Sequence, residues 1–279
     1  METETSPQTA IVAPNAAAPA AAASAMRATL HAIYPAVGVA ALLAVWYATW
    51  LSGLVSKKLL PRPDEVLTMF WTELTTGTLS VDILTSMARV CVGVLIGSAL
   101  AVPVGILLAW YPRVNRMFAP LINFFRSIPP IALSPLVIVY LGIGEPARVS
   151  VLIWASFFTS AIVIYEGVSA IEDIYVRAAR VLGASDREIF VRILIPLVVP
   201  QLFVALRISV GLSWATLVAA ELLAAERGLG AVIQNAGNFF IIPKIYVGIV
   251  CIGALALLMD LGVRHAMAYA VQWQERVMR

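Results

Sequence analysis

The sequence predicts an all-α, polytopic membrane protein with six transmembrane helices. Hydrophobic residues make up 61% of the 279 residues and charged residues only 13%, whereas soluble domains are roughly 45–50% apolar and about 25% charged. The mean hydropathy of +0.91 shows that the apolar excess is spread along the chain. This composition excludes a disordered protein, a disulfide scaffold and an ordinary soluble enzyme.

Six segments are long enough to cross a bilayer. A hydrocarbon core about 30 Å thick needs roughly 20 apolar residues in a helix. Counting on that basis predicts spans at approximately residues 30–54, 86–111, 117–142, 149–171, 196–220 and 243–267. Prolines lie within or beside several of these spans, where neighbouring helices can satisfy the carbonyl groups that a proline leaves free.

The remaining segments differ in character. Residues 1–26 are rich in Ala, Pro, Ser and Thr and lack hydrophobic periodicity, so we interpret them as a disordered tail before a transmembrane domain at 27–279. Residues 56–82 carry apolar side chains at helical spacing, which predicts a short helix at the membrane surface. Residues 221–238 are interpreted as a turn that leads into a short helix.

The distribution of basic residues predicts the topology. An even number of spans puts both termini on one side. If that side is the cytoplasm, it carries Arg27, Arg113, Arg116, Arg177, Arg180, Arg187, Arg192, Arg264, Arg276 and Arg279, and the other side carries only Lys57, Lys58, Arg62, Arg148, Arg227 and Lys244. Cytoplasmic loops of membrane proteins carry the excess of Lys and Arg, so we expect both termini in the cytoplasm.

With this topology residues 172–192 form a cytoplasmic loop, and the pattern inside it predicts a helix. Ile174, Ala178 and Leu182 recur every four residues, which gives one apolar stripe. Gly183 supplies the permissive backbone at which such a helix can end.

A second helix is predicted in the same loop. Ser185 and Glu188 have the spacing of a capping box, in which each residue satisfies a backbone amide of the other. The helix therefore starts at Asp186 and has Ile189 and Phe190 on its apolar side. A folded loop of this kind is costly to order without a binding partner, although a solvated loop with no partner is the alternative.

This loop carries a resemblance to a known family. The stretch Arg177-Ala-Ala-Arg-Val-Leu-Gly183, followed nine residues later by Ile193-Leu-Ile-Pro196, resembles the loop of permease subunits of ATP-binding-cassette (ABC) importers. That loop is written Glu-Ala-Ala, three residues, Gly, nine residues, Ile-x-Leu-Pro. Arg177 replaces the glutamate and Ile195 the leucine, so either the partner has changed to match Arg177 or that contact is dispensable.

Three further segments resemble one subgroup of this family. Leu60-Pro-Arg-Pro-Asp-Glu65, Arg126-Ser-Ile-Pro-Pro130 and the stretch from Ala219 to Gly230 are similar to the subgroup that imports taurine, alkanesulfonates, nitrate or bicarbonate. The resemblance implies the type I ABC importer permease fold in a bacterial inner membrane. It also implies a homodimer with two ATPase subunits and a periplasmic solute-binding protein.

The resemblance assigns the cytoplasmic loop to contact with the ATPase. Ala178 and Ala179 have little bulk, so a partner can approach this helix closely, and the flanking arginines offer charge pairs at the rim. The residues expected to couple to the ATPase are Arg177, Ala178, Ala179, Leu182, Gly183, Ala184, Ser185, Ile189, Phe190 and Pro196. None of the lysines follows the glycine-rich sequence of a phosphate loop, so ATP and Mg²⁺ are expected on the partner and no cofactor on this chain.

Charged residues within spans are candidates for the translocation path because they are costly there. Arg207 is the deepest and could attract an anion. Alternatively, it could form a structural pair with Glu166, Glu221 or Asp260, or donate to carbonyl groups that a nearby proline leaves free. Arg126, Ser127 and Glu221 are the other candidates. Arg89 and Arg126 lie closer to span ends, where we expect them to snorkel toward the surface.

Rival functions have less support in the sequence. An ion-coupled secondary carrier is the alternative transporter, but the two related halves that it should show are not evident. An intramembrane enzyme lacks a nucleophile-and-base pair, and His31 and His265 are isolated, so no catalytic or metal site is predicted. Scattered arginines form no continuous basic face for nucleic acid.

Three glycines in the second predicted span indicate close helix packing. Gly93, Gly97 and Gly105 would let another helix approach, either within the chain or at a dimer seam.

Overall fold

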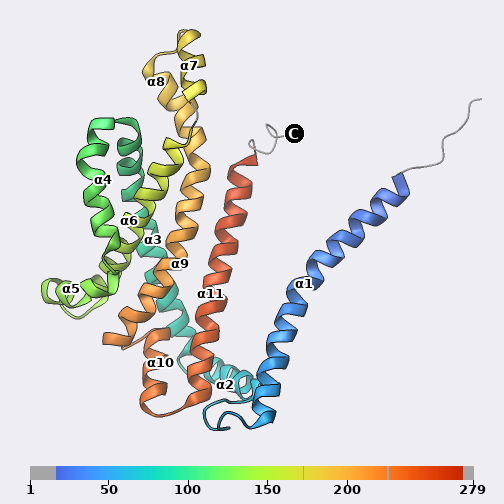
Figure 1. The fold of residues 1–279 in the computed structure, drawn as a ribbon. Coiled ribbons are helices and arrows are strands. Elements are labelled where there is room, and N and C mark those ends of the chain that lie inside the picture. The colour runs from blue at the N-terminus through green and yellow to red at the C-terminus, as the bar shows by residue number, and fades with distance from the viewer. Residues whose placement is uncertain (1–16, 172, 225, 273–279) are drawn as a thin grey trace, which may run out of the picture. The chain divides into compact units, whose positions relative to one another are not determined.

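The computed structural model describes residues 17–171, 173–224 and 226–272, and every regular element in these ranges is a helix (Figure 1). The predicted all-α class is therefore confirmed. The chain divides into two compact units, residues 1–63 and 64–279, and each is described by itself.

The first unit is dominated by helix α1 (Ala17–Ser52). This helix includes residues 17–26 of the segment predicted as a disordered tail, because alanine has the strongest intrinsic helix propensity. Residues 1–16 of that prediction lie outside the described ranges. After α1 the chain folds back on the helix end, where the Trp46 indole donates a hydrogen bond to the Pro61 carbonyl oxygen at 3.1 Å.

The second unit contains the other helices, and Figure 1 shows them along the chain. They are α2 (Pro63–Thr75), α3 (Leu79–Trp110), α4 (Pro112–Ser127), the 3₁₀ turn η1 (Pro130–Leu133), α5 (Ser134–Leu141), α6 (Glu145–Ser169), α7 (Asp173–Val181), α8 (Asp186–Ile189), the π-helical segment η2 (Phe190–Leu194), α9 (Ile195–Ala224), α10 (Leu229–Asn238) and α11 (Ile242–Ala270). Helices α2 and α10 confirm the short helices predicted within 56–82 and 221–238.

The structure differs from the prediction in the number of continuous spans. Within the described ranges, four helical stretches are long and apolar enough to cross a membrane, namely α3, α6, residues 186–222 and α11. The predicted span 117–142 is α4 followed by the η1–α5 segment, bent by 86°. Pro129 and Pro130 lie at this bend, because a proline has no amide hydrogen and disfavours helix in the residue before it. Counting the bent pair as one span gives five.

The first predicted span, residues 30–54, falls in α1. Its apolar part, Ala36–Ser52, is shorter than the four full-length spans and falls in the class of apolar helices with 10–17 residues.

Helices α3, α6 and α9 form the centre of the second unit, and α3 lies very close to α6. A Cβ atom added at Gly97 would be 2.6 Å from the Ile153 carbonyl oxygen and 2.7 Å from the Ser156 Cβ. A Cβ atom added at Gly105 would be 2.8 Å from the Ile164 Cβ. The predicted close approach is therefore confirmed, and it is made to a helix of the same chain rather than to a dimer seam.

Buried serine hydroxyls connect the same three helices. Ser160 of α6 lies 2.9 Å from the Ser98 hydroxyl of α3 and 2.8 Å from the Ser209 hydroxyl of α9. One turn away, Ser156 and Ser213 are 3.0 Å apart. Small hydroxyl residues satisfy each other across packed helices without widening the spacing, so the serines and glycines act together to hold α3, α6 and α9 as one bundle.

We expect Gly97→Ala to destabilise the second unit. The added methyl group collides with backbone and Cβ atoms of α6 that cannot move independently, and such overpacking costs about 1–3 kcal/mol. The melting temperature of the purified protein in detergent measures this loss. Gly211→Ala is the matched control, because apart from its own helical turn no atom lies within 4 Å of the added Cβ. An equal loss in both variants would contradict the packing account.

Candidate functional site

Helix α7 ends at Val181, and Gly183 lies in the turn that follows, as the sequence predicts. The backbone φ of Gly183 is +83°, which a residue with a side chain rarely adopts. The Ala184 amide donates to the Ala179 carbonyl oxygen, and the Gly183 amide donates to that of Arg180, both at 3.0 Å. These two bonds are the Schellman motif, so the turn between α7 and α8 is fixed by backbone hydrogen bonds.

The predicted capping box is present at the start of α8. The Ser185 hydroxyl accepts from the Glu188 amide at 3.4 Å, and the Ser185 amide donates to the Glu188 carboxylate at 3.1 Å. Two ion pairs flank it, Arg180 to Asp186 at 3.4 Å and Arg192 to Glu188 at 3.6 Å. Because these groups are exposed, the pairs contribute little to stability.

The loop is anchored to the bundle through Ile189 of α8 and Phe190 of η2. Ile189 is fully buried, and the Phe190 ring packs edge-on against Trp110 of α3, with ring centroids 6.0 Å apart. Residues 186–222 continue as one helical stretch from this anchor into α9. Helix α8 is therefore joined to a membrane-spanning helix without a break.

The apolar stripe of α7 faces away from the rest of the second unit. The side chains of Ile174 and Leu182 are 64% and 87% exposed, and Ala178 is also exposed. Of the predicted coupling residues, Arg177, Ala178, Leu182, Gly183 and Ser185 are exposed, Ala184, Phe190 and Pro196 are half-buried, and Ala179 and Ile189 are buried. The set thus divides into an outward face and an anchoring face.

The candidates for the translocation path lie in separate surroundings. Arg207 donates to Asp260 of α11 at 2.8 Å, and Asp260 also accepts from Arg264 at 2.7 Å. Of the three partners considered from the sequence, Asp260 is the one that Arg207 contacts here. Arg126 and Ser127 are exposed at the end of α4.

Glu221 is buried, with 1% of its surface exposed, at the centre of a polar network. Its carboxylate accepts from Arg89 Nη1 at 2.5 Å, from the Ser86 hydroxyl at 2.8 Å and from the Gly230 amide at 2.8 Å. Arg89 Nε also donates to Glu145 of α6 at 2.7 Å. The network therefore joins α3, α6, α9 and α10.

The same network holds the turn before α10. Arg89 donates to the Arg227 carbonyl oxygen at 2.8 Å, and the Gly228 amide donates to Asp82 at 2.9 Å. The φ of Gly228 is +120°, and a Cβ atom there would collide with the Glu221 carboxylate. Only glycine fits this position without moving the buried glutamate.

Arg89 corrects one interpretation of the sequence. We expected it to snorkel, but it is only 4% exposed, because two carboxylates and a backbone carbonyl satisfy its guanidinium inside the protein. The sequence did contain a signal: Asp82, Ser86 and Arg89 recur at intervals of four and three residues, which puts three polar groups on one face of α3.

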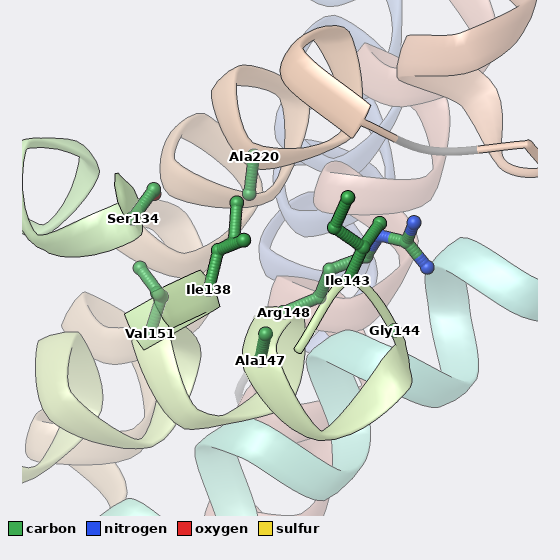
Figure 2. Close-up of a pocket in the computed structure, with 8 residues that line it drawn as sticks. All are labelled: Ser134, Ile138, Ile143, Gly144, Ala147, Arg148, Val151 and Ala220. Carbon is green, nitrogen blue, oxygen red and sulfur yellow. The ribbon is translucent and has the colours of Figure 1, made fainter. Parts of the chain in front are cut away.

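A small cavity lies between α5, α6 and α9 (Figure 2). Ser134 and the Arg148 guanidinium lie on opposite sides of it in Figure 2, with Ile138, Ala147 and Ala220 also in its wall. The Ser134 hydroxyl is buried and has no hydrogen-bond partner within the described residues. The volume of about 20 Å³ admits a single water, so this cavity is too small for an organic anion.

Comparison with known proteins places the chain in a family. Residues 101–268 match the family "Binding-protein-dependent transport system inner membrane component". The chain belongs to this family. It is therefore a permease subunit of an ABC importer in the inner membrane, and membership implies an ATPase and a substrate-binding protein as partners.

Individual relatives agree with this assignment. A probable ABC transporter permease of Brucella abortus (strain 2308) is 44% identical over 86% of this chain and 94% of its own length. The taurine transport system permease TauC of Escherichia coli (strain K12) is 33% identical over 86% and 89% of the two chains. The nitrate import permease NrtB of Synechocystis sp. is 32% identical over 82% and 85%.

A solved structure shows the fold. The chain resembles a subunit in an inward-facing structure of the MetNI methionine ABC transporter, with a TM-score of 0.64 at 22% identity, over 71% of this permease and 98% of that chain. The predicted type I ABC importer permease fold is therefore confirmed.

Proposed function

We propose that this permease imports small anions such as sulfonates, nitrate or bicarbonate. It works as a homodimer with two ATPase subunits and a periplasmic binding protein, and both termini lie in the cytoplasm. The observation that carries the proposed coupling to an ATPase is the outward-facing apolar stripe of α7, held in place by the Schellman motif and the capping box. ATP and Mg²⁺ bind to the ATPase, and the ATPase in turn binds residues 172–192 of the permease.

The geometry of the loop suits the transmission of force. The outward face offers Ala178 and Leu182 to a partner, and the other face is fixed by Ile189 and Phe190. When the ATPase subunits close on ATP, they draw the two loops together, and the continuous helix 186–222 carries that movement into the membrane. ATP thus shifts the population of two conformations of the permease.

The substrate class rests on the relatives. Taurine and nitrate, named for two of the similar permeases, are small and carry a negatively charged group. Selection among such anions falls mainly to the binding protein, which is a separate chain.

Reconstitution in liposomes tests the proposal. We expect no uptake of radiolabelled taurine or nitrate by the permease alone, and ATP-dependent uptake once the ATPase, the binding protein and ATP are added. An imposed ion gradient without ATP should have no effect. Gradient-driven uptake by the permease alone would identify an ion-coupled carrier and contradict the proposal.

We further propose that Arg207 attracts the anion along the path, and a pair of variants tests this. Arg207→Gln should lower ATP-driven uptake several-fold while the complex assembles, because Asp260 keeps its bond to Arg264. Asp260→Asn removes the competing carboxylate, so uptake should be retained or raised. Equal losses of uptake and of assembled complex in both variants would show that the Arg207–Asp260 pair is only structural.

A further inference from the structure

An apolar groove of about 510 Å³ runs along the second unit between α3 and α9. Val102, Ile106 and Trp110 form one wall, Val199 and Leu202 form the other, and Phe190 lies at one end. We call it the α3–α9 groove. Its volume is within the range of pockets that bind small molecules.

The chemistry of the groove matches a hydrocarbon chain. Val102, Ile106, Leu202 and the rings of Trp110 and Phe190 pack on the buried core of α3, α6 and α9, so the floor of the groove is rigid. The side chain of Leu107 at its edge is 46% exposed. In a membrane, an apolar groove at hydrocarbon depth is filled by lipid unless protein covers it.

Charged residues follow directly at the end of the groove. Trp110 and the 51%-exposed Tyr111 are lining residues of the kind that mark the membrane–water interface. Arg113 and Arg116 come next, one turn apart on α4, and both are exposed. Basic residues beside grooves between transmembrane helices on the cytoplasmic side bind anionic lipid headgroups.

We propose that the α3–α9 groove binds one anionic phospholipid of the cytoplasmic leaflet. An acyl chain lies along Ile106, Val199 and Leu202, and the phosphate headgroup contacts Arg113 and Arg116. The inference rests on the proposed topology, which puts this end of α3 at the cytoplasm.

The position of the groove links the lipid to the ATPase loop. Phe190 belongs both to the groove and to the anchor of residues 172–192. It begins the π-helical segment η2, and π-helical turns are frequent at functional sites. A bound acyl chain therefore supports the point at which the loop joins α9.

Native mass spectrometry of the full-length permease, purified with its ATPase, tests lipid binding. Phosphatidylglycerol is the anionic probe and phosphatidylcholine the zwitterionic one. We expect one phosphatidylglycerol to be retained per permease chain, in preference to phosphatidylcholine. Arg113→Gln should lower its affinity about fivefold, the effect of one basic residue near an anionic surface, and Lys58→Gln, an exposed lysine outside the groove, should not.

A groove-filling variant tests the acyl-chain site. Val199→Trp should abolish retention of this phosphatidylglycerol, and Val250→Trp, at a 54%-exposed position of α11, should not. Should Val199→Trp fail to fold, the comparison of Arg113→Gln with Lys58→Gln still tests whether the lipid binds. Equal retention of the two lipids, or no loss with Arg113→Gln, would overturn the proposal.

Protein in the groove is the competing outcome. With Cys91 and Cys251 replaced by alanine, a disulfide formed in native membranes between Leu107→Cys and Leu43→Cys of α1 would show that α1 covers the groove, and the lipid proposal would be wrong. ATP-driven uptake in phosphatidylcholine liposomes, measured in parallel, shows whether the transport function holds independently of the lipid.

Discussion

Replacing Leu182 by aspartate should reduce ATP-driven uptake more than about tenfold and leave the permease folded. The Leu182 side chain is 87% exposed, so its loss removes no packing inside the protein. In the complex, however, the carboxylate would be buried in an apolar interface with the ATPase, where an unpaired charge is strongly unfavourable. Uptake into liposomes and the melting temperature in detergent measure the two effects.

Two variants make the comparison specific. Leu182→Met keeps the apolar contact and should retain most of the uptake. Leu59→Asp introduces the same charge at another exposed leucine, 59% exposed, in the segment that the topology puts on the periplasmic side, and should have little effect. Normal uptake by Leu182→Asp would contradict the proposal that the apolar stripe of α7 couples the permease to the ATPase.

Replacing Glu221 by alanine should destabilise the permease by about 3–5 kcal/mol, because one partner of a buried ion pair is lost. Arg89 remains buried, and the Ser86 hydroxyl and the Gly230 amide lose their acceptor. The yield of folded protein and its melting temperature in detergent should both fall.

The controls for this prediction lie in the same network and the adjoining turn. Glu145→Ala should cost less than Glu221→Ala, because the Glu145 side chain is 57% exposed and water can replace it beside Arg89. Glu226→Ala, at an exposed residue of the turn before α10, should leave the melting temperature unchanged. If Glu221→Ala also melted like the wild type, the network would have no structural role.

The cytoplasmic loop could be predicted from the sequence because its determinants are local. The capping box joins Ser185 to Glu188, and the turn needs only Gly183 at a positive φ. Each signal acts within a few residues, so spacing alone was sufficient to place α7 and α8. The direction in which the stripe faces required the structure.

The buried network could not be predicted in the same way. Arg89 and Glu221 are 132 residues apart in the sequence, and no periodicity relates them. Near the start of a span, an isolated arginine is expected to snorkel, and only tertiary packing shows that its partners lie inside. The polar face of α3 indicated an inward-facing surface without identifying Glu221 or Glu145.

The bend in the third predicted span is an intermediate case. Pro129 and Pro130 are visible in the sequence, and a proline disfavours a continuous helix. Hydropathy nevertheless ran through them, because α4 and the η1–α5 segment together are apolar enough for a membrane span. Hydropathy therefore located the segment, and the prolines decided its shape.

Cysteine crosslinking at α7 tests the central claim most directly. With Cys91 and Cys251 replaced by alanine, Ala178→Cys is treated with a homobifunctional thiol crosslinker in membranes that contain an ATPase with single surface cysteines. We expect a permease–ATPase product that changes in yield when ATP binds. A product formed only from Glu145→Cys, at the other end of the bundle, would contradict both the topology and the coupling role of the loop.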